Sequence, residues 1–369
     1  MASLALLSYC RVSFELHELG WDAEWARVFA PYAADGLVPA RVAIEFNYIY
    51  RLYAESGELQ AQHAGRMRHQ AEGRENRSAV GDWVAVLPTP GEAAGTIEAV
   101  LPRRSRFSRK VAGETTEEQI VAANIDTVFL VMGLDGDYNP RRLERYLLMA
   151  YESGARPVVL LNKSDVADHL PADLDEIKGL GVGIPVHPIS ARERSGIDVI
   201  ERYLGPGRTG ALLGSSGVGK STIVNALMGD EKLKTRDVRA SDSRGRHTTR
   251  HRHLILLGSR GLLIDTPGMR ELQLWTQSES ARETFEDVES LAAGCHFTDC
   301  QHRDEPKCAV KQAIAEAALP AERLESYLKL QEEMRSLEVR KDARAQIDEK
   351  RKMKTISQSL KKLYKSRDR

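Results

Sequence analysis

The chain has 369 residues, of which 42% are hydrophobic and 29% charged, and its formal net charge is +0. This length allows two or three folded domains, and the balanced charge by itself predicts no partner. No run approaches the ~20 apolar residues of a membrane-spanning helix. The first residues lack the basic segment and the cleavage site of a signal peptide. We therefore expect a cytoplasmic protein without a membrane partner.

Residues 1–36 are expected to form an N-terminal extension with one short helix, from Asp22 to Phe29. Pro31 is expected to end this helix, because proline lacks the backbone donor that a helix needs. No motif in this extension indicates a role for it.

Residues 37–112 carry the pattern of a small β-barrel. Apolar and polar residues alternate along two segments, and glycines separate the segments. The alternating apolar residues are Val42, Ile44 and Phe46, and then Trp83, Ala85 and Leu87. A barrel of about five strands is the simplest arrangement for such a module. The basic run Arg103–Lys110 at its exit is either a solvated linker or a nucleic-acid contact.

Residues 113–278 alternate between apolar strands and helices. Apolar runs typical of strands buried on both faces lie at residues 127–132, 157–161, 184–189, 210–213, 253–257 and 261–264. Helices are expected at residues 141–152 and 220–228. The alternation predicts a mainly parallel sheet with helices on both faces, and such sheets bind ligands at the C-terminal ends of their strands.

A motif typical of phosphate-binding loops follows the strand at residues 210–213. It comprises Gly214, Ser215, Ser216, Gly217, Val218, Gly219, Lys220, Ser221 and Thr222. The backbone N–H groups of such a loop surround phosphates, and the next helix adds the positive end of its dipole. Lys220 is expected to neutralise β- and γ-phosphate charge, and Ser221 to ligate Mg²⁺. The alternative, a glycine-rich structural turn, leaves Lys220 with nothing to neutralise.

A second motif, Asn-Lys-Ser-Asp at residues 162–165, is typical of guanine-reading loops. Asp165 would accept two N–H groups of guanine that adenine does not offer, which disfavours a P-loop ATPase. Lys163 would lie across the base, and Asn162 would join this loop to the phosphate loop. The alternative role for Asp165 is a helix N-cap. A supporting loop that meets the guanine O6 is expected at Ser190 and Ala191.

The order of these two motifs is inverted relative to Ras-like GTPases, in which the phosphate loop comes first. The chain therefore resembles a circularly permuted GTPase. Asp265, at the start of an Asp-Thr-Pro-Gly motif, would hold Mg²⁺ through water, and the N–H of Gly268 would sense the γ-phosphate. Switch I is expected at residues 244–251, where Thr248 or Thr249 would ligate Mg²⁺, with Thr249 favoured.

The residue that orients the attacking water is not given by these motifs. Met269 occupies the position that holds a catalytic Gln in Ras-type enzymes, and Met cannot orient water. His247 is the candidate catalytic residue; the alternatives are a surface histidine or an RNA phosphate contact. We expect slow intrinsic hydrolysis that a partner stimulates.

Three of the four cysteines cluster in residues 279–345, which otherwise have a helical pattern. Sparse, clustered cysteine indicates a reducing compartment with a metal site rather than a disulfide framework. The candidate ligands are Cys295, Cys300, His302 and Cys308. This set completes a tetrahedral Zn²⁺ site with no position open to water, so the metal would be structural. The alternative is reduced cysteines in a helical core.

The chain ends in a basic tail, residues 346–369. From residue 335 to residue 369 there are 13 Lys or Arg and five Asp or Glu. This excess of positive charge is either a solvated helical face or a contact with a polyanion.

In their order, these motifs resemble the ribosome small-subunit-dependent GTPase A family (RsgA, also called YjeQ) over roughly Val38 to Arg340. The resemblance implies an N-terminal OB-fold β-barrel that binds RNA, a central circularly permuted α/β P-loop GTPase domain and a C-terminal α-helical zinc-binding domain. It also implies GTP or GDP, Mg²⁺ and one structural Zn²⁺ as cofactors, and a monomeric protein. The implied partner is the small (30S) ribosomal subunit, through its 16S rRNA and proteins.

Two functions agree with this resemblance. In the first, the protein is a GTP hydrolase in late maturation of the small subunit. The subunit stimulates hydrolysis, and hydrolysis releases the protein from the subunit. In the second, it is an rRNA-binding checkpoint protein that uses GTP as a conformational signal, with incidental turnover. The complete phosphate and Mg²⁺ motifs favour the first, and Met269 favours the second.

Overall fold

The computed structural model describes residues 13–46, 48–70, 77–110, 118–178, 183–229, 252–265, 284–303, 305–332 and 335. The chain divides into two compact units. The first contains the described residues up to 265, and the second contains those from 284 onward. Within these ranges, no helix has the length and apolar character needed to cross a membrane.

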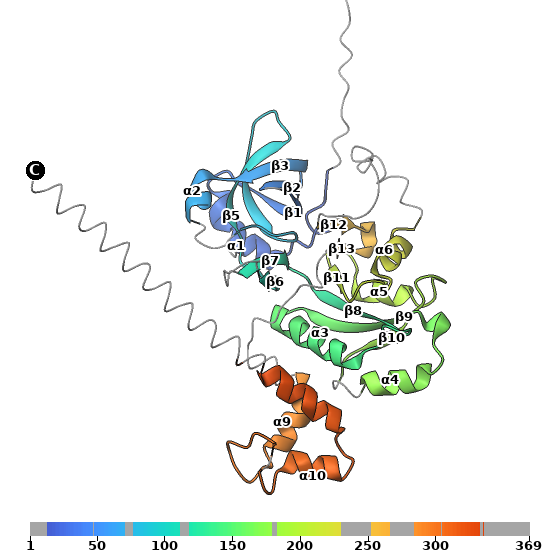
Figure 1. Cartoon of the computed structure of the whole chain (residues 1–369). Helices are drawn as coiled ribbons and strands as arrows, with labels where there is room; N and C mark the ends of the chain where they lie inside the picture. Colours follow the sequence, from blue (N-terminus) through green and yellow to red (C-terminus); the bar gives the residue numbers. More distant parts are fainter. Residues whose placement is uncertain are drawn as a thin grey trace, which may run out of the picture. The chain divides into compact units, whose positions relative to one another are not determined.

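The first unit contains a closed barrel of five strands (Figure 1). The strands are β1 (Val38–Phe46), β2 (Ile49–Ala54), β3 (Gly57–His63), β4 (Trp83–Pro88) and β5 (Ala94–Val100). They pair in the order β1-β2-β3-β5-β4, and β4 also pairs with β1, which closes the barrel. The helix α2 (Gly65–Gln70) lies between β3 and β4 in the chain. This is the OB-fold barrel that the sequence predicts.

The alternating sequence pattern fills this barrel. Residues of β3 are alternately buried and exposed, as a strand with one face in the core requires. The core contains the buried side chains of Val42, Leu52, Leu59, Val84 and Ile97. The pattern expected for β1 is wrong at its end, where Phe46 is 51% exposed. A β-bulge between Val42 and Ile44 shifts the register before that point.

Helix α1 (Ala23–Ala33) precedes the barrel. Asp22 caps it by accepting the backbone N–H of Trp25 at 3.0 Å. The expected end at Pro31 is wrong, because Pro31 lies inside the helix. So close to the C-terminal end, the missing N–H of a proline removes only one helical hydrogen bond.

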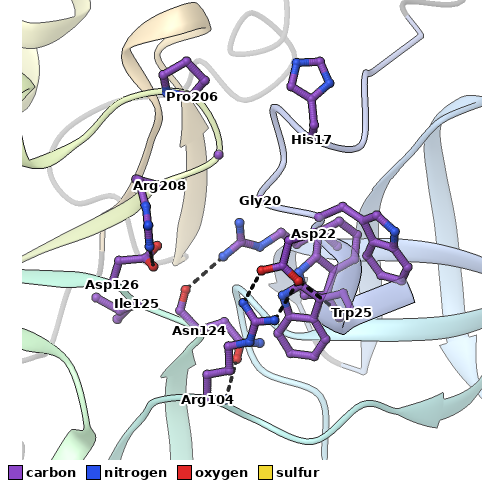
Figure 2. A pocket seen from close by; sticks show the side chains of 14 residues that line it. His17, Gly20, Asp22, Trp25, Arg104, Asn124, Ile125, Asp126, Pro206 and Arg208 are labelled. Carbon is purple, nitrogen blue, oxygen red and sulfur yellow. Dashed lines mark hydrogen bonds and ion pairs between the residues drawn. The ribbon is translucent and has the colours of Figure 1, made fainter. Parts of the chain in front are cut away.

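Aromatic side chains attach α1 to the barrel. The rings of Trp21 and Trp83 meet edge to face, with centroids 4.7 Å apart. Arg104 stacks over Trp25 at 4.4 Å and donates two hydrogen bonds to Asp22, of 2.6 and 2.7 Å (Figure 2). The first residues of the described chain are therefore part of the first unit rather than an appendage.

Beneath these rings, a buried guanidinium joins three segments of the chain. Arg41 donates from Nε to the carbonyl of Gly81 at 3.2 Å and from Nη2 to that of Asn124 at 3.0 Å. Its Nη1 donates to the carbonyl of Leu19. Arg41 also lines a polar cavity of about 220 Å³ between α1, the barrel and the residues before β8 and β11 (Figure 2).

A mainly parallel sheet follows in the same unit. Its strands are β8 (Thr127–Gly133), β9 (Arg156–Asn162), β10 (Val186–Pro188), β11 (Thr209–Leu213), β12 (His253–Leu256) and β13 (Leu262–Asp265). They lie in the order β10-β9-β8-β11-β13-β12, with only β12 antiparallel to its neighbour β13. Strand β11, which leads into the phosphate loop, is thus central in the sheet although three of these strands precede it in the chain.

Helices cover both faces of this sheet, as the alternating pattern predicts. They are α3 (Pro140–Ser153), α4 (Leu170–Lys178), α5 (Asp198–Tyr203) and α6 (Lys220–Met228), with short 3₁₀ turns η2 (Ser164–Val166) and η5 (Gly258–Arg260). Helices α5 and α6 pack in one core with Phe129 and Val131 of β8. Helix α3 contacts β8 and β9, and its buried Leu143 and Leu147 lie outside that core. Because side chains alternate along β8, α3 covers the opposite face.

Backbone pairing joins the barrel to the sheet. Ile44 of β1 pairs with His253 of β12, and His253 pairs on its other side with Asp265 of β13. Tyr53 Oη lies 3.4 Å from His253 Nε2. A separate antiparallel hairpin, β6 (Arg106–Lys110) and β7 (Glu118–Ala123), connects the two parts in the chain.

The second unit is helical. It contains α9 (Glu286–Ala292), α10 (Ala309–Ala315) and a helical segment at residues 321–332. Buried Arg323 joins this segment to the start of α9. It forms an ion pair with Asp287 at 2.9 Å, donates to the carbonyl of Thr284 at 2.7 Å and stacks over the ring of Phe285 at 4.2 Å. The helical pattern expected for residues 279–345 is therefore present in the described residues.

Candidate functional site

The phosphate loop connects β11 to α6, and space requires glycine at two of its positions. A Cβ atom on Gly214 would lie 2.3 Å from the carbonyl oxygen of Val131. A Cβ atom on Gly219 would lie 2.2 Å from Nδ2 of Asn162, and Gly219 has a left-handed φ of 98°. The loop backbone therefore packs directly on β8 and on the predicted base loop.

Lys220, the first residue of α6, folds back over this loop. Its Nζ donates to the carbonyl oxygens of Gly214 at 2.6 Å and of Ser215 at 2.5 Å. Ser221 and Thr222 are exposed in the first turn of α6. The first N–H groups of a helix have no partners within the helix and carry the positive end of its dipole. This rim has the chemistry of an anion-binding site.

Three loops meet at the buried amide of Asn162, which the sequence predicts only for the base loop and the phosphate loop. Its Nδ2 donates to the carbonyl of Val218 in the phosphate loop at 2.7 Å. Its Oδ1 accepts the backbone N–H of Ala191 at 2.9 Å. Asn162 is only 2% exposed, so both hydrogen bonds are shielded from water. The base loop, the phosphate loop and the supporting loop are therefore held in one constellation.

Asp165 and Ser190 also lie together. Ser190 Oγ donates to Asp165 Oδ1 at 2.6 Å, and the same hydroxyl accepts the backbone N–H of Glu193 at 3.2 Å. Asp165 is exposed and lies within η2, whose N-cap position is Lys163. It therefore does not cap that helix, and its carboxylate lies at the surface beside the supporting loop.

Two acidic residues of the site have no counterpart in the sequence prediction. Asp135 and Asp137 lie in the loop at residues 134–139, between β8 and α3. Asp135 forms an ion pair with Lys163 at 2.5 Å, and Asp137 accepts a hydrogen bond from Ser215 Oγ at 2.6 Å. The hydrogen bond from Lys163 holds the pKa of Asp135 below its ordinary value. The only sequence signal was their position directly after a fully buried strand.

The remaining predicted nucleotide contacts are divided between described and undescribed residues. Asp265 ends β13, next to β11 in the sheet. The candidate catalytic residue His247 and the predicted contacts Thr248, Thr249 and Gly268 lie outside the described residues. The tail at residues 346–369 lies outside them as well.

The second unit brings the four predicted zinc ligands together. The ligand atoms of Cys295, Cys300, His302 and Cys308 all lie within 4.8 Å of one another. Sγ of Cys295 is 3.8 Å from Sγ of Cys308, and Nδ1 of His302 is 3.4 Å from Sγ of Cys308. A tetrahedral Zn²⁺ with ordinary bond lengths would place its ligands about 3.8 Å apart for S–S and about 3.5 Å for N–S. The donor set and its spacing therefore fit zinc.

The pKa values of His302 and Cys295 suit metal binding, whereas burial raises the pKa of the Cys300 thiol to about 11. Burial lowers the pKa of His302, which favours the neutral imidazole that binds metals. For the Cys295 thiol, burial raises the pKa, but the N–H groups of Val310 and Ala309 outweigh it, and the pKa lies below its ordinary value. These N–H groups lie in the first turn of α10. The structure thus stabilises a thiolate at one ligand position.

Two arginines of the basic run after the barrel are paired with acidic side chains. Arg103 forms an ion pair at 2.8 Å with Asp82, whose side chain is fully buried. Arg104 is paired with Asp22 and Glu24 at 2.6 and 3.0 Å. Both guanidinium groups therefore hold the barrel to its surroundings, which weakens the nucleic-acid interpretation of these two residues.

The fold and this site define a circularly permuted GTPase. A phosphate loop and a base loop meet at the C-terminal ends of β11 and β9, yet the base loop comes first in the chain. An OB-fold barrel precedes them, and a Cys₃His cluster follows.

Comparison with known proteins gives the family. The RsgA GTPase family model matches residues 100–275. The small ribosomal subunit biogenesis GTPase RsgA of Opitutus terrae is 46% identical over 327 residues, which cover 86% of this chain and 89% of that protein. The structure of YjeQ from Thermotoga maritima is 26% identical, with a TM-score of 0.59, and covers 81% of this chain and 98% of that one. YloQ, described as a circularly permuted GTPase, has the same fold, with a TM-score of 0.58, 22% identity and coverage of 81% of this chain and 96% of that one.

The chain belongs to the RsgA GTPase family and is a GTP hydrolase.

Proposed function

We propose that this GTPase acts in late maturation of the small (30S) ribosomal subunit, which stimulates hydrolysis, and that hydrolysis releases the protein. The observation that carries this proposal is the near full-length similarity to a small ribosomal subunit biogenesis GTPase, at 46% identity. The contacts of Asn162 support it, because they hold the predicted base loop and the phosphate loop together.

In this proposal, each part of the site has a separate task. The phosphate-loop backbone and Lys220 bind the phosphates of GTP or GDP. Asp165 reads the guanine edge, with Lys163 across the base and with Ser190 and Ala191 in support. Mg²⁺ would be held by Ser221, by Asp265 through water and by Thr249 or Thr248, and would offset phosphate charge when bound. The Cys₃His cluster would hold one structural Zn²⁺.

Base reading by Asp165 has a direct test. Asp165→Asn exchanges a carboxylate that accepts two N–H groups for an amide that can accept only one, so affinity for GTP should fall relative to xanthosine triphosphate. The exposure of Asp165 beside Ser190 supports this role. Unchanged GTP selectivity would overturn the assignment.

Hydrolysis requires a water-orienting group other than Met269. We assign it to His247, because it lies in the expected switch I next to Thr248 and Thr249. His247→Ala should bind GTP with wild-type affinity and lose stimulated turnover. Full turnover of this variant would remove His247 from the mechanism.

The barrel offers a surface that fits RNA. Phe46 and Tyr48, on either side of the β1–β2 turn, are 51% and 58% exposed. Arg77 lies over the Tyr48 ring at 4.8 Å and donates to its hydroxyl at 3.2 Å. Exposed rings beside a guanidinium are the combination on which bases stack in OB-folds. The excess positive charge from residue 335 to residue 369 would add non-specific attraction to rRNA.

The experiment that tests the function compares GTP turnover by the full chain alone, with purified small subunits and with large subunits. We expect strong stimulation by small subunits only. Equal rates in all three mixtures, or stimulation by large subunits, would contradict the proposal.

The second candidate, a checkpoint protein with incidental turnover, is favoured by Met269 alone. The His247→Ala variant separates the two functions. If hydrolysis is the exit step, this variant will remain on small subunits in the presence of GTP. If it leaves as fast as the wild type, GTP binding rather than hydrolysis is the signal.

A further inference from the structure

The loop at residues 134–139 links both halves of the nucleotide site. It starts beside the base loop, where the N–H of Leu134 donates to the carbonyl of Asn162 at 2.8 Å. It ends at Asn139, the N-cap of α3, which accepts the N–H of Arg142 at 3.0 Å. Between these anchors, Asp135 contacts the base loop and Asp137 contacts the phosphate loop.

Both carboxylate oxygens of Asp135 are held by hydrogen bonds. One carboxylate oxygen pairs with Lys163 Nζ at 2.5 Å, and the other accepts the backbone N–H of Asp137 at 3.2 Å. A Cβ atom on Gly133 would lie 2.5 Å from Asp135 Oδ1 and 3.6 Å from Lys163 Nζ. The carboxylate therefore uses the space that a side chain at Gly133 would fill. Lys163 itself is fixed by a left-handed backbone, with φ of 67°.

Asp137 is fixed from the opposite side. Arg142 of α3 pairs with its carboxylate at 2.8 Å and also donates to its backbone carbonyl. The carboxylate then accepts Ser215 Oγ at 2.6 Å. The backbone carbonyl of Ser215 also accepts a hydrogen bond from Lys220 Nζ at 2.5 Å. Asp137 is thus two contacts away from the phosphate-binding lysine.

The charges of this loop are compensated locally. Each carboxylate has its own cation, Lys163 for Asp135 and Arg142 for Asp137. A bare carboxylate beside a triphosphate would repel it, whereas a paired one adds little net charge. This arrangement allows two acidic residues to lie at the edge of an anion-binding site.

We infer that Asp135 is a positioning residue for nucleotide binding, which fixes Lys163 before guanine arrives, and that Asp137 does the same for Ser215 on the phosphate side. This inference rests on the proposed roles of Lys163 and the phosphate loop. A lysine held by a carboxylate loses its side-chain freedom in advance, so less entropy is lost on binding. Because the base is common to GDP and GTP, Asp135 acts on both nucleotides equally.

The test measures GDP and GTP affinity, kcat and KM for the full-length Asp135→Ala variant. We expect affinity for both nucleotides to fall by about three- to fivefold, with kcat unchanged, as for an interaction equal in ground and transition states. Asp135→Glu should restore part of the loss. The matched control is Asp198→Ala on α5, which removes an exposed ion pair of 2.6 Å with Arg202, outside the site, and should leave affinity unchanged.

A double-mutant cycle separates positioning from general damage. If Asp135 acts through Lys163, Asp135→Ala will cost nothing further in a Lys163→Ala background. An equal loss in both backgrounds, or affinity within twofold of wild type for Asp135→Ala, overturns the inference. If the wild-type chain itself fails to bind guanine nucleotides, the proposed function fails instead.

The phosphate side has an independent cycle of Asp137→Ala with Ser215→Ala. Each single variant should weaken GTP binding, and the two losses should not add because they remove the same hydrogen bond. Additive losses would show that Asp137 does not act through Ser215.

Discussion

Asn162 packs so closely on Gly219 that position 219 has no room for a side chain: a Cβ atom there would lie 2.2 Å from Nδ2 of Asn162. The two residues belong to different loops, and Asn162 reaches the adjacent Val218 across 56 residues of chain. The contact depends on the folded structure and not on the two loops being neighbours in the chain. Circular permutation can therefore exchange the order of the loops without altering the site that they form.

Asn162→Ala should weaken GTP and GDP binding together. It leaves the carbonyl of Val218 and the N–H of Ala191 without this buried partner. An unsatisfied buried group costs about 1–3 kcal/mol, so affinity should fall by at least about fivefold. Equilibrium binding of a fluorescent GDP checks this. Asp198→Ala is the control, since it removes only an exposed ion pair with Arg202 outside the site; an equal loss of affinity in this control would contradict the tether.

Gly219→Ala should abolish nucleotide binding rather than weaken it. The new methyl group meets Asn162, and the residue must keep a φ of 98° that alanine avoids. Gly36→Ala is the matched control, because Gly36 also has a positive φ, of 75°, but has nothing within 4 Å of its Cβ position. Calorimetric titration measures GDP affinity and thermal melting measures stability for both variants. Together they separate the steric clash with Asn162 from the backbone strain of a positive φ. Equal effects of the two substitutions would mean that strain alone matters.

The parts of the site that could be predicted from sequence are those whose residues belong to one short sequence motif. The phosphate loop and the base loop each lie at the end of one apolar strand, so their chemistry could be recognised without the fold. The contact of Asn162 with the phosphate loop also followed from the motif. The zinc ligands were recognisable because three of the four cysteines and His302 fall within 14 positions, Cys295–Cys308.

The roles of Asp135 and Asp137 could not be read in the same way. In sequence they lie in a polar turn containing a glycine, and their partners Lys163 and Ser215 are 28 and 78 residues away. The ion pair of Arg104 in the basic run was hidden for the same reason, because its partner Asp22 lies at a separation of 82 residues. Charge in a sequence gives no sign of whether folding will neutralise it.

Removal of zinc should unfold the second unit and spare the first. With a closed Cys₃His set, binding of the metal contributes directly to folding. Cys308→Ser, or a strong chelator, should abolish bound zinc by elemental analysis and make residues after 284 sensitive to protease, while GDP still binds. Cys10→Ser is the control, since Cys10 is not among the four predicted ligands. Retention of one zinc per chain in Cys308→Ser would contradict the ligand assignment.

The ion pair of Asp22 and Arg104 should make the attachment of α1 dependent on pH. The hydrogen bond from Arg104 lowers the pKa of Asp22 from 3.8 to about 2. A lowered pKa in the folded state stabilises the protein above the unfolded value of 3.8, and this stabilisation is lost as pH falls through about 2. The two side chains are 50% and 40% exposed, so the pair should contribute less than about 1 kcal/mol at pH 7.

Asp22→Asn isolates this charge, because asparagine caps a helix about as well as aspartate and can still accept the N–H of Trp25. Urea unfolding should show the variant less stable than the wild type at pH 7, with the difference reduced to about half at pH 3. Asp22→Ala should lose about 1 kcal/mol more at both pH values, since the cap is lost as well. Equal stability of Asp22→Asn and the wild type at both pH 7 and pH 3 would show that the carboxylate acts as a cap alone. Arg104 would then hold α1 through its stacking on Trp25 and its ion pair with Glu24, and not through Asp22.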